Sequence, residues 1–238
     1  MSKNFICCLF ILCLFLFLML EESWAQKEFY VGLRLAPQSS FLINSADRDS
    51  GFTRTFTSGY VLGGAVGQNF TKHFGFEFSV LYSLQGQKYT RERISQGGEK
   101  VLINEQTELS YLKVPMLLRY FTPFLLEERR VYLSVHFGPQ VGILLQMRQY
   151  EDSKLLPENV VYSRYIRRRD LFNPTEIHLV GAIGLEYTPS PQFLLTALIR
   201  GDYSLVDALD KTLKTPGQPN SYNATLGLIL GFSYLINR

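Results

Sequence analysis

The chain has 238 residues and a formal net charge of +3; 46% of its residues are hydrophobic and 14% are aromatic. This length fits one domain or two small ones, and the apolar and aromatic content excludes a disordered chain. The charge is too small to indicate nucleic acid as a partner. Because the sequence holds no phosphate loop, metal-ligand cluster or nucleotide motif, we expect no cofactor.

The first segment, residues 1–25, has the pattern of a secretory signal peptide. It opens with a lysine near its start, continues with an unbroken apolar run over residues 5–20, and ends with small residues before a cleavage site after Ala25. An uncleaved anchor helix is the alternative, but the run is shorter than the ~20 residues that a span needs. We therefore expect a mature domain of residues 26–238. All cysteines fall in the apolar run, which leaves that domain without disulfides or thiol chemistry.

Eight segments of the mature domain alternate between apolar and polar residues with a period of two. Successive side chains of a strand point to opposite faces, so this period predicts β-strands. The segments are 28–36, 58–70, 73–88, 107–121, 129–147, 176–188, 192–204 and 221–237.

The hairpin of residues 107–147 displays the two faces most fully. Its first arm places Val114 and Met116 on a continuous apolar face, and Lys113 and Arg119 on the opposite face. A soluble β-sandwich would bury the apolar face against a second sheet. A membrane barrel would turn it to lipid and the polar face to the lumen.

The connections between the segments decide between these two folds. Short connections (71–72, 122–128 and 189–191) alternate with long ones of about 15 residues or more (37–57, 89–106, 148–175 and 205–220). Outer-membrane barrels have short periplasmic turns and long outer loops, and aromatic residues gather at both ends of these segments as in a barrel. The sequence therefore predicts an all-β fold, an eight-stranded antiparallel transmembrane β-barrel with an up-and-down meander.

The chain resembles the PorT-like outer-membrane β-barrel family of the Bacteroidota. The matching segments are KHFGFEFSVLYSLQGQKY, LSYLKVPMLLRYF, VYLSVHFGPQVGILL and HLVGAIGLEYTPSPQF. The resemblance implies an outer-membrane location, and some relatives that share the family name take part in type IX secretion. The final residues depart from the terminal aromatic residue that is typical of barrel assembly signals.

Polar residues on the predicted inner faces form a charge network in the lumen. We expect it to contain Arg34, Glu77, Lys113, Arg119, His136, Glu186, Arg200 and Asp202. An eight-stranded barrel has room for side chains only, and a dry interior needs charges of both signs in pairs. We expect Lys113, Arg119 and His136 to pair with Glu77 and Glu186. A narrow gated pore and a buried catalytic group remain open as alternatives.

Three functions remain open. The first is a non-enzymatic outer-membrane protein, a monomer by default, that displays long extracellular loops in envelope integrity, in surface interaction or as an accessory to secretion. The second is a lipid A-modifying enzyme, which needs a histidine near a serine and an acid; His178 could face Ser204 or Asp202 on the next strand. The third is a small-solute channel.

A cluster of arginines in the loop 148–175 is the strongest surface signal, and its members are Arg164, Arg167, Arg168 and Arg169. Arginine binds phosphate bidentately, so these residues predict contact with lipopolysaccharide; a solvated loop is the alternative. The expected partners are therefore outer-membrane lipid, lipopolysaccharide, the barrel-assembly machinery and, as an open alternative, components of a secretion complex.

Overall fold

The structure is a computed structural model, which describes residues 28–44, 53–55, 57–94, 100–123, 130–156, 160–166, 172–208 and 220–236. The predicted signal peptide and its cleavage site lie outside these residues. Within them, no helix has both the length and the apolar character to cross a membrane.

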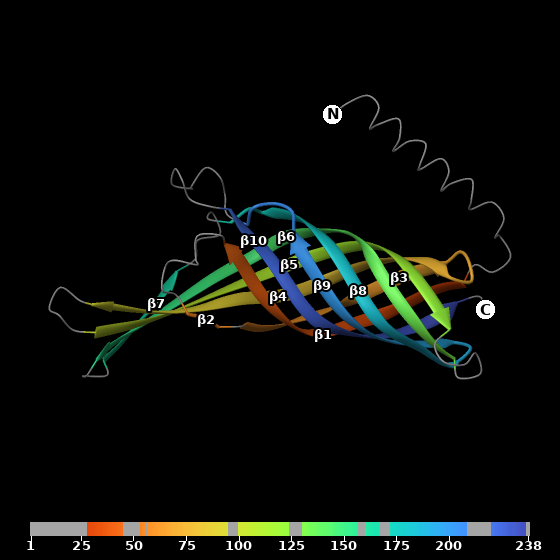
Figure 1. Cartoon of the computed structure of the whole chain (residues 1–238), viewed down its shortest axis with the longest axis horizontal. Helices are drawn as coiled ribbons and strands as arrows, with labels where there is room; N and C mark the ends of the chain where they lie inside the picture. Colours follow the sequence, from red (N-terminus) through yellow and green to blue (C-terminus); the bar gives the residue numbers. More distant parts are fainter. Residues whose placement is uncertain are drawn as a thin grey trace, which may run out of the picture.

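Eight strands close into an antiparallel ring (Figure 1). In order around the ring they are β1 (Glu28–Asn44), β3 (Thr57–Asn69), β4 (Phe74–Ile94), β5 (Lys100–Pro123), β6 (Val131–Leu156), β8 (Thr175–Ser190), β9 (Phe193–Ser204) and β10 (Ser221–Ile236). Strand β10 pairs back onto β1, which leaves the ring without an edge. The ring confirms the predicted eight-stranded barrel.

The apolar face of each strand points away from the ring. Leu33 is 65% exposed, Ile199 is 59% exposed and Phe137 is 55% exposed. On the hairpin of β5 and β6, Met116 and Leu118 also point outward, as the period of two predicts. A continuous apolar surface of this kind is stable against lipid and unstable in water.

Aromatic side chains pair at two levels of this outer surface. Near the short turns the ring centroids of Phe193 and Phe232 are 5.3 Å apart, and toward the other end those of Tyr203 and Tyr222 are 5.7 Å apart. A strand of about ten residues, tilted by about 40°, rises about 25 Å, which is the height of the apolar band of an outer-membrane barrel. Phe193 and Tyr203 are ten positions apart on β9, so the two levels mark the edges of such a band.

Strands β4, β5 and β6 continue past the second aromatic level (Figure 1). Two short strands flank them there, β2 (Thr53–Thr55) on β4 and β7 (Val160–Ile166) on β6, which gives a sheet in the order β2-β4-β5-β6-β7. We call this sheet the extension. It consists of β2, β7 and residues 84–94, 100–110 and 146–156.

Strands occupy much of three predicted loops, 37–57, 89–106 and 148–175, so those predictions are wrong in large part. In the first of these loops, β1 continues to Asn44 and β2 covers Thr53–Thr55. Strand β4 runs to Ile94 and β5 begins at Lys100, with ladder pairs along almost the whole interval. The polar residues Lys88 and Asn104 are exposed there, and Thr90 is half-buried. Outside the apolar band a strand needs no lipid-facing residues, so the alternation that marks strands in a sequence is lost.

A β-bulge on β6 separates ring from extension. Ser110 pairs with Gln146 whereas Tyr111 pairs with Leu144, which leaves one extra residue, Leu145, on β6. The extra residue reverses the alternation, so that Leu144 is buried before it and Met147 after it. Gln146 would face the lumen if the alternation of β6 continued unbroken, and the bulge leaves it half-buried instead.

Side chains fill the middle of the lumen. An apolar layer crosses its middle, formed by Ala36, Val61, Leu81, Ala182, Leu198 and Ile229. Two cavities of about 10 Å³ each adjoin this layer, and a volume of that size holds about one water molecule. Polar groups lie on both sides of the layer and form the candidate site.

Candidate functional site: the lumen charge network

The structure places all eight predicted lumen residues on the inner face of the ring, each between 1% and 9% exposed. They are Arg34, Glu77, Lys113, Arg119, His136, Glu186, Arg200 and Asp202. Buried charges are tolerated only when they are paired and hydrogen-bonded, so the contacts of each one decide what the network does.

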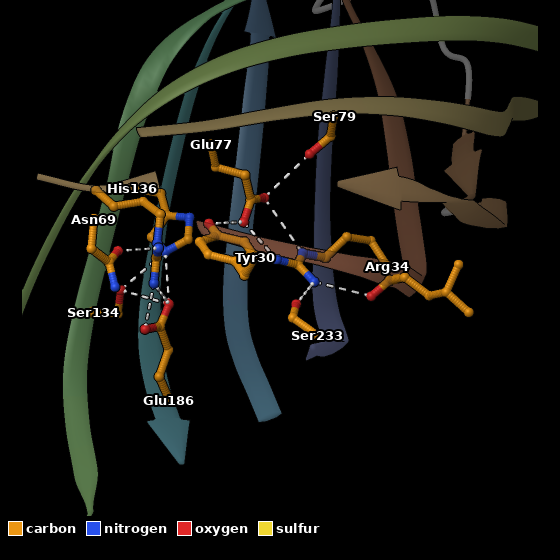
Figure 2. A network of polar contacts seen from close by, with 11 residues as sticks. Tyr30, Arg34, Asn69, Glu77, Ser79, Ser134, His136, Glu186 and Ser233 are labelled. Atoms are coloured by element: carbon orange, nitrogen blue, oxygen red, sulfur yellow. Dashed lines mark hydrogen bonds and ion pairs between the residues drawn. The ribbon is translucent and has the colours of Figure 1, made fainter. Parts of the chain in front are cut away.

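The first group ties β1 to β4 and β10 (Figure 2). Arg34 Nη2 lies 2.6 Å from Glu77 Oε2, the Tyr30 hydroxyl donates to the same oxygen at 2.9 Å, and Arg34 Nη1 donates to Ser233 Oγ at 2.9 Å. These side chains reach across β3, whose inner face is rich in glycine. At Gly67 an added Cβ would overlap the Tyr30 ring. The glycine therefore makes room for the contact between β1 and β4.

The second group ties β5 to β8 across β6 (Figure 2). Arg119 Nη2 donates to both carboxylate oxygens of Glu186, at 2.7 and 2.8 Å, and its Nη1 donates to Asn69 Oδ1 at 3.0 Å. Ser134 Oγ donates to Glu186 at 3.1 Å, and His136 Nε2 lies 3.2 Å from the same oxygen. Arg119 and His136 thus both contact Glu186, one of the two acidic partners that the sequence predicts for them.

Aromatic rings connect the two groups. The Arg119 guanidinium carbon lies 4.8 Å from the centroid of the Tyr30 ring and 5.4 Å from that of Phe121. Such cation–π contacts are strengthened when both partners are desolvated. The Tyr30 ring, whose hydroxyl binds Glu77, therefore links the two ion pairs into one network in the short-turn half of the lumen.

A third group lies on the other side of the apolar layer and corrects one predicted pair. Lys113 Nζ donates to both oxygens of Asp202, at 3.0 and 3.1 Å, and pairs neither with Glu77 nor with Glu186. Lys113 is opposite Leu81 in the β4–β5 ladder, four residues along β4 from Glu77. At that level the tilt of the strands brings Asp202 of β9 across the lumen from Lys113. Arg200, also on β9, donates to Gln140.

His178 completes the third group. Its Nε2 lies 3.1 Å from Glu176 Oε2 and its Nδ1 lies 3.4 Å from Asp202 Oδ1. Both distances are within ion-pair range, but neither contact has the angles of a hydrogen bond. Glu176 accepts a hydrogen bond from the Tyr111 hydroxyl at 2.7 Å, and Asn223 donates to that hydroxyl at 3.3 Å.

The sequence prediction missed Glu176 and Tyr30 as lumen residues. With Glu176 the inner face carries four acidic and four Lys or Arg side chains, so their formal charges balance. Glu176 stands ten positions before Glu186 on the same strand, and even spacing places both on one face. The period of two therefore already predicts that Glu176 faces the lumen. No sequence signal, however, shows which charges meet across the lumen.

An apolar cap covers the third group at the loop end, formed by Leu109, Tyr111, Leu144, Met147, Phe172 and Ala208. Backbone hydrogen bonds fix the cap: Leu144 N donates to Pro174 O at 2.9 Å, and Ala208 N donates to Ser221 O at 2.7 Å. His178 and Asp202 consequently lie 1% and 6% exposed beneath it.

The histidine–serine–acid arrangement of an enzyme is only half formed. His178 and Asp202 meet as the sequence allowed, and His178 is opposite Ser204 in the β8–β9 ladder. The Ser204 hydroxyl instead donates to the carbonyl of Val206 at 2.8 Å and is fully buried. The Ser204 hydroxyl therefore directs its proton to the backbone of Val206.

The arginine cluster is placed only in part. The backbone of Arg164 lies in β7, opposite Glu151 of β6, which sets it in the extension. Arg167, Arg168 and Arg169 lie outside the residues that the structure describes.

Residues 24–210 match the model of a family described as the outer membrane protein beta-barrel domain. The chain belongs to this family. Together with the closed ring and its apolar outer face, this membership identifies an integral protein of the outer membrane. The comparison with curated proteins finds no match to the chain.

Several solved structures are similar to this chain over most of its length. OprG from Pseudomonas aeruginosa is 14% identical, with 89% of this chain and 96% of that chain covered, at a TM-score of 0.46. Ail of Yersinia pestis is 15% identical, with 87% of this chain and 99% of that chain covered, at a TM-score of 0.40. The outer membrane protease OmpT from Escherichia coli is 9% identical, with 89% of this chain and 97% of that chain covered, at a TM-score of 0.35. Likenesses at this level carry no information about activity.

Proposed function

We propose that this outer-membrane barrel is a non-enzymatic scaffold that displays the extension on the cell surface. The observation that carries the proposal is the extension itself, in which five strands form a sheet beyond the second aromatic level. A ring of eight strands needs no such sheet to span a membrane. Elements built beyond the bilayer are where barrels of this kind contact other molecules.

The filled lumen supports a scaffold more than the two alternatives. A channel needs a continuous polar path, but an apolar layer and an apolar cap cross the described part of this lumen. A lipid A-modifying enzyme needs a histidine that an acyl chain can reach beside a serine and an acid, and His136 and His178 are 2% and 1% exposed. The third histidine, His73, is exposed, but it lies at the short-turn end, where its Nδ1 is 3.1 Å from the backbone oxygen of Phe121. Unchanged lipid A in the mass spectrum of a deletion strain, and baseline conductance in planar bilayers, are the results expected.

The finer role that we propose is that of a PorT-like protein of the Bacteroidota envelope. In that role the extension assists a type IX-like secretion complex, supports envelope integrity or binds other surfaces. The arginine cluster, Arg164, Arg167, Arg168 and Arg169, would bind lipopolysaccharide phosphates beside the barrel. The short turns would face the periplasm, where the barrel-assembly machinery inserts the chain.

Shortening the extension tests whether the function depends on the displayed sheet while the barrel itself still folds. In the test variant, residues 89–105 are removed and Lys88 is joined to its ladder partner Gln106 through an Asn-Gly turn, which suits a two-residue hairpin. We expect the trimmed chain to keep its heat-modifiable gel migration, because the ring is intact. We expect it to resemble the deletion strain in secreted-protein yield, detergent sensitivity or adhesion, whichever the deletion alters. Full complementation by the trimmed chain would refute display by this hairpin.

A further inference from the structure

A cavity of about 330 Å³ opens at the short-turn end of the lumen, at the opposite end of the barrel from the extension. Residues of seven ring strands and of the turn between β3 and β4 line it. Binding pockets for small molecules begin at about this size. We call this cavity the vestibule.

One part of the vestibule wall is apolar. Leu194 and Leu235 are 5% and 6% exposed and form a cluster with Tyr30 at the base of the lumen. Phe121 and Tyr132 add two rings in an edge-on contact, with centroids 6.3 Å apart. Such a wall favours an apolar body in the vestibule over water.

The acidic groups of the vestibule already have hydrogen-bond donors. Glu186 accepts from Arg119, Ser134 and His136. Glu28 accepts from Asn69 Nδ2 at 3.2 Å. A ligand that brings further donors therefore gains little here.

Two basic groups of the vestibule keep unused donors. The Arg119 side chain is 1% exposed, and its Nε has no hydrogen-bond partner in the described part of the chain. Lys72, on the turn between β3 and β4, is exposed and forms no ion pair with any described residue. The Arg119 Nε is itself covered by its neighbours, so the Lys72 ammonium is the accessible donor of this wall and Arg119 contributes its buried positive charge. The wall is therefore complementary to a ligand that brings an anionic acceptor.

We propose that the vestibule binds a small amphipathic carboxylate. The carboxylate group contacts the exposed Lys72 and faces the buried charge of Arg119, and the apolar body packs on Leu194 and Leu235. Two sources share this chemistry: a free organic acid, and the carboxyl end of a peptide with an apolar last residue. The site is independent of the extension, so its test can fail without touching the proposed function.

The test is calorimetric titration of the mature chain in lipid nanodiscs. The probes are 4-phenylbutyrate and an acetylated Gly-Gly-Gly-Leu peptide with a free carboxyl end, each against its uncharged amide. We expect at least one acid to bind about tenfold or more tightly than its amide, because a charge-assisted hydrogen bond is lost in the amide. The acid that binds identifies the source.

Neighbouring substitutions on β9 supply the control. Leu194→Trp fills the vestibule and should abolish binding, whereas Leu195→Trp, on the lipid side, should leave it unchanged. Lys72→Gln, at an exposed position, should weaken binding about threefold, as the loss of an exposed charge does, and it remains informative if Leu194→Trp fails to fold. Equal binding of acid and amide, undiminished binding by a folded Leu194→Trp chain, or no binding of either acid would overturn the proposal.

Discussion

Glu186→Leu should destabilise the barrel by about 3–5 kcal/mol, because it leaves the fully buried Arg119 guanidinium without its counter-charge. The carboxylate accepts two hydrogen bonds from Arg119 and also contacts Ser134 and His136, so one substitution removes the centre of the second group. The measurement is equilibrium urea unfolding in vesicles, followed by the loss of heat-modifiable gel migration.

Two controls separate charge from packing. The double variant Arg119→Leu with Glu186→Leu removes both charges and should recover much of the loss, since a buried pair often contributes little net stability against apolar residues. Glu108→Leu, on the half-buried part of the extension, should change stability by about 0.5 kcal/mol or less. If Glu186→Leu unfolds with the same midpoint as Glu108→Leu, the Arg119–Glu186 pair does not hold β5 to β8.

Met116→Arg should destabilise the barrel by about 2–4 kcal/mol, the cost of an arginine near the midplane of the bilayer. Met116 is 39% exposed on the outer face of β5. It is opposite Phe78, midway along β4 between the aromatic residues Phe74 and Tyr82. The same unfolding measurement applies.

Asn104→Arg is the matched control, since Asn104 is an exposed residue of the same strand within the extension, and the substitution should be nearly neutral. Gln140→Glu should also be mild, because Arg200 donates to that side chain and would gain an ion-pair partner. Equal losses for Met116→Arg and Asn104→Arg would mean that the outer face of β5 does not meet lipid.

The sequence allows prediction of the ring because lipid imposes a strict pattern. Every strand in the apolar band must turn one face to hydrocarbon, so residues such as Leu33 and Ile199 recur at even spacing. The same spacing puts Arg34, Glu77 and Glu186 inside. These assignments depend only on the alternation along one strand, which any single sequence displays.

The pairings and the extension could not be read in this way. The Lys113–Asp202 pair depends on the stagger of strands around the ring, which spacing along the chain does not contain. Residues 89–94 and 100–106 lie beyond the apolar band, where water on the strand surface removes the selection for alternation. The β-bulge at Leu145 is likewise a feature of two strands together.

Cysteine accessibility in intact cells tests most directly whether the chain is an outer-membrane barrel that displays its extension. Every native cysteine precedes residue 26, so an introduced thiol is unique in a chain that begins at Gln26. With a membrane-impermeant maleimide, we expect Asn104→Cys to react in intact cells and Lys72→Cys to react only after the outer membrane is opened. Met116→Cys should stay unlabelled in both conditions. Labelling of Met116→Cys as fast as Asn104→Cys, or of Lys72→Cys but not Asn104→Cys in intact cells, would contradict the account.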